Sequence, residues 1–104
     1  MKKIKRAISI RQPWAHEILS GRRDIEYRSQ PTNIRERVYV YVSCTKDMPC
    51  DFQTGAIFGS VEITDCYLDD FNQVYCYILK NPKRFSKPLM PKNHPQPRFW
   101  RPQL

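Results

Sequence analysis

The chain has 104 residues, which is enough for one domain with a modest core. It contains no apolar run of about 18 residues, so the sequence excludes a membrane-spanning helix. Lys and Arg number 18 against 10 Asp and Glu, for a formal net charge of +8, and both ends are basic while the middle is acidic. If the ends meet in space, they form a basic face suited to a phosphate-bearing partner. Alternatively, the same excess of positive charge only keeps the protein soluble.

The first elements predicted are a strand over residues 6–10 and a two-turn helix after it. Pro13 fits the first helical position, because the N–H that proline lacks would be unpaired there. Apolar residues four apart, beginning at Trp14, form a stripe on the helix, and we interpret Trp14 as a core residue. Gly21 fits a left-handed residue just past the end of the helix.

Residues 24–28 alternate with a period of two, which predicts a strand. Ile25 and Tyr27 share one face, and Glu26 and Arg28 share the other. Neither charged side chain belongs in an apolar core without a partner. The charged face is therefore either solvated, which the spacing alone favours, or the wall of a cleft.

Three further strands are predicted over residues 37–43, 55–67 and 74–79, with a bend or bulge at Gly59. From residue 80 onward the chain is basic and rich in proline. Several strands, a single early helix and no strand–helix alternation argue against a parallel α/β fold. The pattern predicts a small, strongly curved, mostly antiparallel sheet or barrel.

The four cysteines, Cys44, Cys50, Cys66 and Cys76, show no CxxC spacing, so we expect no metal site and no cofactor. Residues 1–6 are basic, but no apolar stretch follows them, so we expect no signal peptide and a cytoplasmic protein. Free thiols are expected in that reducing compartment. Cys44 and Cys50 fall in a predicted loop, where a reactive thiol remains an alternative.

Two motifs resemble the signature of the ASCH domain family, in particular its small stand-alone bacterial members. Residues 9–15 read Ser-Ile-Arg-Gln-Pro-Trp-Ala, and the family begins with serine, isoleucine, a basic residue, glutamine, proline and an aromatic residue. Residues 21–28 match a glycine-x-lysine-x-x-glutamate-x-arginine motif, with Arg23 in place of the lysine. Weaker similarity covers residues 55–63 and 77–85.

The resemblance implies a mainly β fold with small helices (α+β). This is the PUA-like barrel of five to six strands, with a short helix after the first strand. It also implies a single domain over residues 1–104, with residues 80–104 packed on the barrel as a basic, proline-rich segment. A cleft is expected beside the first helix. Family members are generally described as RNA-binding, and some small bacterial members are amidohydrolases of acylated nucleosides or ribonucleases.

Arg23 changes the chemistry that the resemblance implies. A lysine there can lose its proton and react, whereas arginine stays charged and forks onto a phosphate or a carbonyl oxygen. The hydrolase branch also has threonine where Glu26 stands. Both differences count against amide hydrolysis and leave binding untouched.

We therefore predict an RNA- or nucleotide-binding module, favoured as a monomer, with a positively charged cleft. Arg23 and Arg28 are the first candidates for contacts to phosphate or a base edge. The residues predicted to bind the ligand are Arg11, Gln12, Arg23, Glu26, Arg28, Ser43 and Glu62. The alternatives are a small hydrolase or ribonuclease that uses Glu62 or Ser43 in the same cleft, and a protein-interaction adaptor that docks through residues 80–104.

Overall fold

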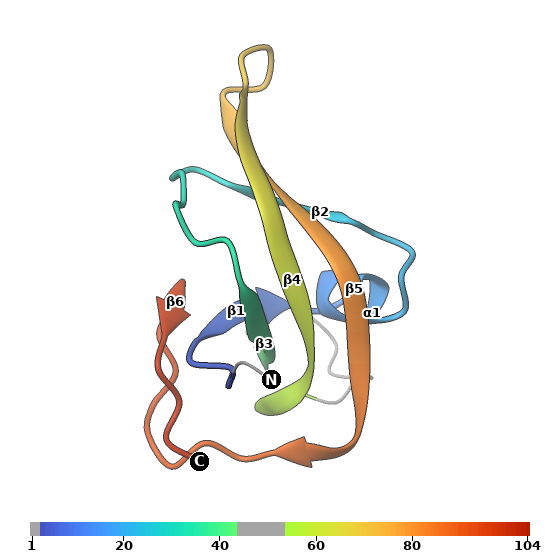
Figure 1. Ribbon diagram of the computed structural model, residues 1–104, viewed down its shortest axis with the longest axis vertical. Coiled ribbons are helices and arrows are strands. Elements are labelled where there is room, and N and C mark those ends of the chain that lie inside the picture. Colours follow the sequence, from blue (N-terminus) through green and yellow to red (C-terminus); the bar gives the residue numbers. More distant parts are fainter. Residues whose placement is uncertain (1–2, 44–53) are drawn as a thin grey trace.

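The computed structural model describes residues 3–43 and 54–104, which form one curved six-stranded sheet and one short helix (Figure 1). The elements are β1 (Ala7–Arg11), α1 (Trp14–Leu19), β2 (Ile25–Arg28), β3 (Arg37–Ser43), β4 (Ala56–Asp69), β5 (Val74–Leu89) and β6 (Phe99–Trp100). The strand order is β2-β5-β4-β3-β1-β6, and only β1 and β3 run parallel. The predicted mainly β class is confirmed, with the sheet curved into a half-barrel. Within the described residues, no helix is both long and apolar enough to cross a membrane.

Strand β3 separates two clusters of buried side chains, because its valines and tyrosines alternate across the sheet. Val38, Val40 and Val42 face the main core inside the half-barrel. Tyr41 belongs to a smaller cluster that includes Trp100, with their ring centroids 5.4 Å apart at 80°. The last strand is therefore anchored by an aromatic pair as well as by the backbone hydrogen bonds of the sheet.

The helix α1 starts and stops close to the predicted positions. Pro13 is the N-cap rather than the first helical residue, and the Gln12 side-chain oxygen accepts a hydrogen bond from the His16 backbone N–H at 3.0 Å. Gly21 has a φ of +81°, which confirms the predicted left-handed residue after the helix. The core interpretation of Trp14 is wrong: its side chain is 41% exposed. It is the first residue of the helix, so no preceding helical turn lies under its side chain, and the buried face is formed by Ala15, Ile18 and Leu19.

Strand β5 is longer than predicted, because it continues past residue 79 to Leu89. Pro82 and Pro88 in this stretch discourage a strand assignment from sequence. However, β2 pairs with β5 only through residues 75–78, so one edge of the later part is free of sheet partners. The β4–β5 register also shifts in this stretch, and prolines are tolerated at such edges and bulges.

Gly59 lies at the predicted bulge of β4, where the β3–β4 register shifts. A Cβ atom there would overlap the backbone carbonyl oxygen of Lys83 and lie 2.6 Å from Leu19 Cδ2. The glycine therefore lets β5 and α1 approach β4 closely.

We expect Gly59→Ala to lower the free energy of unfolding by about 3 kcal/mol, because a backbone group and not only a flexible side chain must move. Gly21→Ala serves as the matched control. Its Cβ meets nothing within 4 Å, and only the positive φ penalises it, by about 1 kcal/mol. Urea denaturation of both variants measures the difference, and equal losses would contradict the close approach at Gly59.

Candidate functional site

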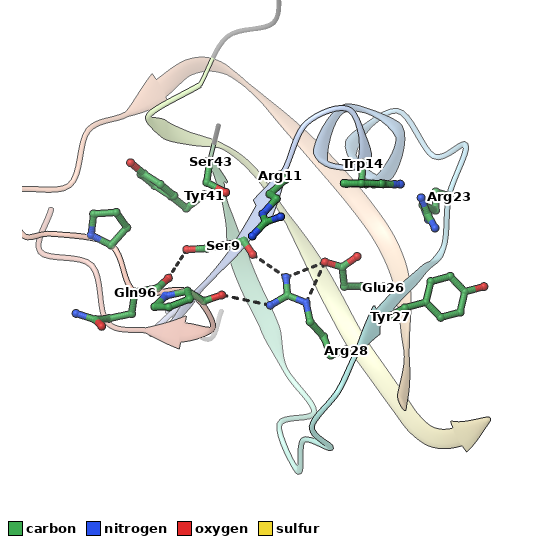
Figure 2. Close-up of a pocket in the computed structure, with 12 residues that line it drawn as sticks. Ser9, Arg11, Trp14, Arg23, Glu26, Tyr27, Arg28, Tyr41, Ser43 and Gln96 are labelled. Carbon is green, nitrogen blue, oxygen red and sulfur yellow. Dashed lines mark hydrogen bonds and ion pairs between the residues drawn. The ribbon is translucent and has the colours of Figure 1, made fainter. Parts of the chain in front are cut away.

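The half-barrel has an open seam between β2 at one edge of the sheet and β1 with β6 at the other. A pocket of about 680 Å³ lies at this seam (Figure 2). Its lining residues are Ser9, Arg11, Trp14, Arg23, Glu26, Tyr27, Arg28, Tyr41, Ser43, Pro95, Gln96 and Pro97. Segments from both ends of the chain and from β3 therefore share one cavity.

Arg28 crosses the seam from β2 (Figure 2). Its Nη2 donates to the backbone oxygen of Ser9 at 2.6 Å, and its Nη1 donates to the backbone oxygen of Pro97 at 3.4 Å. Its Nε and Nη2 donate to Glu26 Oε2 at 3.1 and 2.7 Å. Most of the five guanidinium N–H groups are thus used within the protein, which makes Arg28 a link between the two edges of the sheet.

Ser9 fixes the opposite wall of the pocket. Its hydroxyl donates to the backbone oxygen of Gln96 at 2.6 Å and accepts from Trp100 Nε1 at 3.1 Å. Its backbone oxygen accepts from Arg28. One serine on β1 therefore positions the C-terminal segment and receives the link from β2.

A second contact crosses the seam behind Arg28. The rings of Tyr77 on β5 and Phe99 on β6 stack with centroids 6.1 Å apart. The Tyr77 hydroxyl donates to the backbone oxygen of Gln30 at 2.6 Å, and burial raises the pKa of Tyr77. The stacked pair closes the inner side of the seam with apolar surface.

Arg23 is held between two aromatic rings at the outer rim of the pocket. Its guanidinium carbon lies 5.9 Å from the ring centroid of Trp14 and 5.5 Å from that of Tyr27. Its Nε donates to the backbone oxygen of Ile25 at 3.2 Å, and Glu17 Oε2 lies 3.7 Å from its Nη1. Both ring contacts are in the range of cation–π attraction, so the rim is a preorganised arrangement of flat groups.

Arg11 differs from the other two pocket arginines. Within the described residues it forms no hydrogen bond or ion pair, and its side chain is exposed. Figure 2 shows Arg11 and Glu26 extending into the same space between Trp14 and Arg28. The second carboxylate oxygen of Glu26 likewise has no donor from the described residues. Among the described residues, the pocket therefore contains one cation without a partner, Arg11, and one carboxylate oxygen without a donor.

The structure brings five of the seven predicted binding residues together at the pocket, namely Arg11, Arg23, Glu26, Arg28 and Ser43. Gln12 is buried under the pocket and holds the start of α1. Glu62 lies outside the lining and pairs with Arg37, with 3.2 Å between Oε1 and Nη2. Glu62 could serve as the base of this cleft only if its side chain reached the cleft, and Glu62 is not among the lining residues.

The charged face of β2 lines the pocket and is not solvated. The side chains of Glu26 and Arg28 are 12% and 20% exposed, whereas Tyr27 on the alternate face is 47% exposed. Sequence reasoning missed Tyr27 and the wall at residues 95–97. Tyr27 alternates with the charged residues of β2, so the sequence pattern assigned its ring to an apolar face. The wall contributes Pro97 through its backbone oxygen, for which the sequence carries no signal.

No metal-binding cluster of three or more His, Cys, Asp or Glu residues occurs within residues 3–43 and 54–104. Cys66 and Cys76 are free thiols, and Cys76 is buried as a small core residue. The predicted loop with Cys44 and Cys50 lies outside the described residues.

We expect Arg28→Ala to lower the free energy of unfolding by about 2–4 kcal/mol, because it leaves the Glu26 carboxylate poorly solvated and unpaired. Adding Glu26→Gln should recover part of that loss, since the neutral amide costs less without its partner. The control Arg6→Ala removes a more exposed ion pair with Glu36 and should cost about 1 kcal/mol or less. Urea denaturation measures all three variants, and an Arg28→Ala loss no larger than that of the control would argue against the link across the seam.

Comparison with known proteins places this geometry in a family. The ASCH domain matches residues 8–89. Crystal structures of ASCH from Zymomonas mobilis have the same fold. A tyrosine-to-phenylalanine variant superposes with a TM-score of 0.67 at 12% identity, covering 95% of this chain and 90% of that chain. The unsubstituted protein gives 0.66 at 12% identity, covering 92% and 85%.

A serine-to-alanine variant of the same protein gives a TM-score of 0.63 at 14% identity, covering 92% of this chain and 86% of that chain. No curated protein is similar enough in sequence to match the chain. At these identities the structures establish the fold, and the match over residues 8–89 establishes the family. The chain belongs to the ASCH domain family.

Proposed function

We propose that the seam pocket binds a nucleotide, either free or within an RNA chain, and that Arg11 contacts its phosphate. The observation that carries this proposal is the difference in contacts among the three pocket arginines. Arg28 is engaged by the protein, Arg23 is held between two rings, and Arg11 is exposed with no partner in the described structure. An unpaired guanidinium at a concave site is the natural ligand for a phosphate.

Glu26 supplies the complementary half of the site. Arg28 donates twice to its Oε2 and so fixes the carboxylate, while Oε1 remains available as an acceptor. An amino group on the edge of a base is a donor that such an oxygen can accept from. The exposed rings of Trp14 and Tyr27 beside it offer surfaces on which a base can stack.

The same geometry favours binding of the ligand over catalysis. Arg23 stays protonated and cannot act as a base or nucleophile. The carboxylate in the pocket is ion-paired, and Glu62, the other candidate base, is paired with Arg37 elsewhere. We therefore assign Arg28 as a positioning residue and leave catalysis out of the proposal.

We expect Arg11→Ala to weaken the binding of a labelled single-stranded RNA by roughly tenfold, because one phosphate contact is lost. The slope of log affinity against log salt concentration should fall by about 0.7 in magnitude for that contact. Fluorescence anisotropy across a salt series measures both quantities. The control is Arg22→Ala, since Arg22 is exposed, occupies an unspecified position of the motif and lies outside the pocket lining.

An equal loss in both variants would mean that the charge of the whole protein, and not the pocket, attracts RNA. Titration with a mononucleotide alongside the RNA separates the two forms of the ligand. Binding of neither one by the unmodified protein would remove the proposal altogether.

A further inference from the structure

The long hairpin of β4 and β5 projects beyond the rest of the molecule, and its turn lies at the opposite end from the two chain termini (Figure 1). Strand β3 pairs with β4 only as far as Glu62, so the hairpin continues without cover on that edge. We call residues 65–73 the hairpin tip. No described residue outside the hairpin forms a sheet pair with the hairpin tip, because β2 pairs only with residues 75–78.

The hairpin tip exposes large apolar side chains. Phe71 is 93% exposed, and Tyr67 and Leu68 are 48% and 44% exposed. Phe71 in the turn buries almost none of its ring in the fold, and Tyr67 and Leu68 at the end of β4 add partly exposed apolar surface next to the turn. Exposed apolar side chains of this size are typical of an interaction surface.

The hairpin tip is also acidic within a basic protein. No Lys or Arg occurs from residue 47 to residue 79, although the whole chain has 18. Four glutamates form the ion pairs of the described structure, whereas Asp65, Asp69 and Asp70 belong to none of them. No cation of the described residues therefore forms an ion pair with the aspartates of the hairpin tip.

The turn that contains Phe71 is ordered by its own hydrogen bonds before any partner binds. Asp69 Oδ1 accepts from the backbone N–H groups of Phe71 and Asn72 at 3.1 and 3.2 Å, and Oδ2 accepts from Asn72 Nδ2 at 2.9 Å. The bond from the Asn72 side chain is the main cause that lowers the pKa of Asp69. Gln73 Nε2 donates back to the Asp70 backbone oxygen at 2.6 Å. A partner consequently meets an ordered turn and pays little entropy to fix it.

We propose that the hairpin tip is a docking surface for a basic polypeptide, with Phe71 as the apolar anchor and the flanking aspartates pairing with Lys or Arg of the partner. Charge complementarity selects this occupant. RNA and anionic lipid surfaces carry the same sign as the three aspartates and are repelled. A cationic side chain, in contrast, is attracted by the three aspartates, and the half-exposed ring of Tyr67 is an aromatic group on the same hairpin tip.

The test is selection of random displayed peptides on the purified full chain. The protein has a net charge of +8, so unspecific attraction would enrich acidic peptides. We expect the enriched peptides to be basic and to contain a large apolar residue. Phe71→Ala should weaken a selected peptide by about tenfold or more, as the loss of a central aromatic anchor does. Asp70→Lys should weaken it further and flatten its salt dependence.

The control variant is Met90→Ala, because Met90 is 67% exposed and lies outside the hairpin. It should leave peptide binding unchanged, and thermal unfolding of each variant confirms that the fold is intact. Enrichment of acidic or neutral peptides, no enrichment, or insensitivity to Phe71→Ala would overturn the proposal. Loss of RNA affinity in Phe71→Ala, or a dimer in sedimentation velocity that this variant abolishes, would assign the surface to RNA or to a second copy and would also overturn it.

Discussion

The Arg28 guanidinium, together with the stacked rings of Tyr77 and Phe99, joins two edges of a sheet that backbone pairing leaves apart. In the strand order β2-β5-β4-β3-β1-β6, the described strands β2 and β6 do not pair, so the seam needs another link. Arg28 supplies it by donating to backbone oxygens of Ser9 and Pro97 and to the carboxylate of Glu26. A closed barrel has no room for a ligand at this place, because strand pairing would fill it. The open seam creates the pocket, and Arg28 keeps it from opening further.

The use of Arg28 for closure changes how the charge of the protein should be interpreted. A net charge of +8 gives no direction to a ligand by itself. What matters is which cations the fold leaves unpaired within a concave site. Arg28 is engaged by carbonyl and carboxylate oxygens, and Arg23 lies between Trp14 and Tyr27. Within the described residues, Arg11 is the pocket arginine without a hydrogen bond or ion pair, and it lies at the point where β1 leads into the helix.

Much of the fold followed from the sequence, because local patterns encode it. The valine alternation of β3 and the glycine after the helix were both predicted and are confirmed. The site was predicted less completely, for two physical reasons. The alternation in β2 separates two faces of the strand but does not say which face lines the pocket. That depends on the contacts of Arg28 with Ser9 and Pro97, which lie 19 and 69 residues away in sequence. Both contribute backbone oxygens, which every residue type carries. The extension of β5 was missed because proline counts against a strand unless the free edge is known.

The two ends of the β4–β5 hairpin have opposite electrostatic character, and this separation bears on both proposals. Strand β2 pairs with residues 75–78 of β5, so the wall of the pocket is attached partway along the same hairpin that ends in Asp69 and Asp70. Under the two proposals, the aspartates at the far end would repel phosphate there, while Arg11 would attract it at the seam. A phosphate-bearing chain and a basic polypeptide would therefore not compete for one surface. Under the two proposals, the acidic middle and the basic ends of the sequence correspond, in the folded chain, to two separate places for partners of opposite charge.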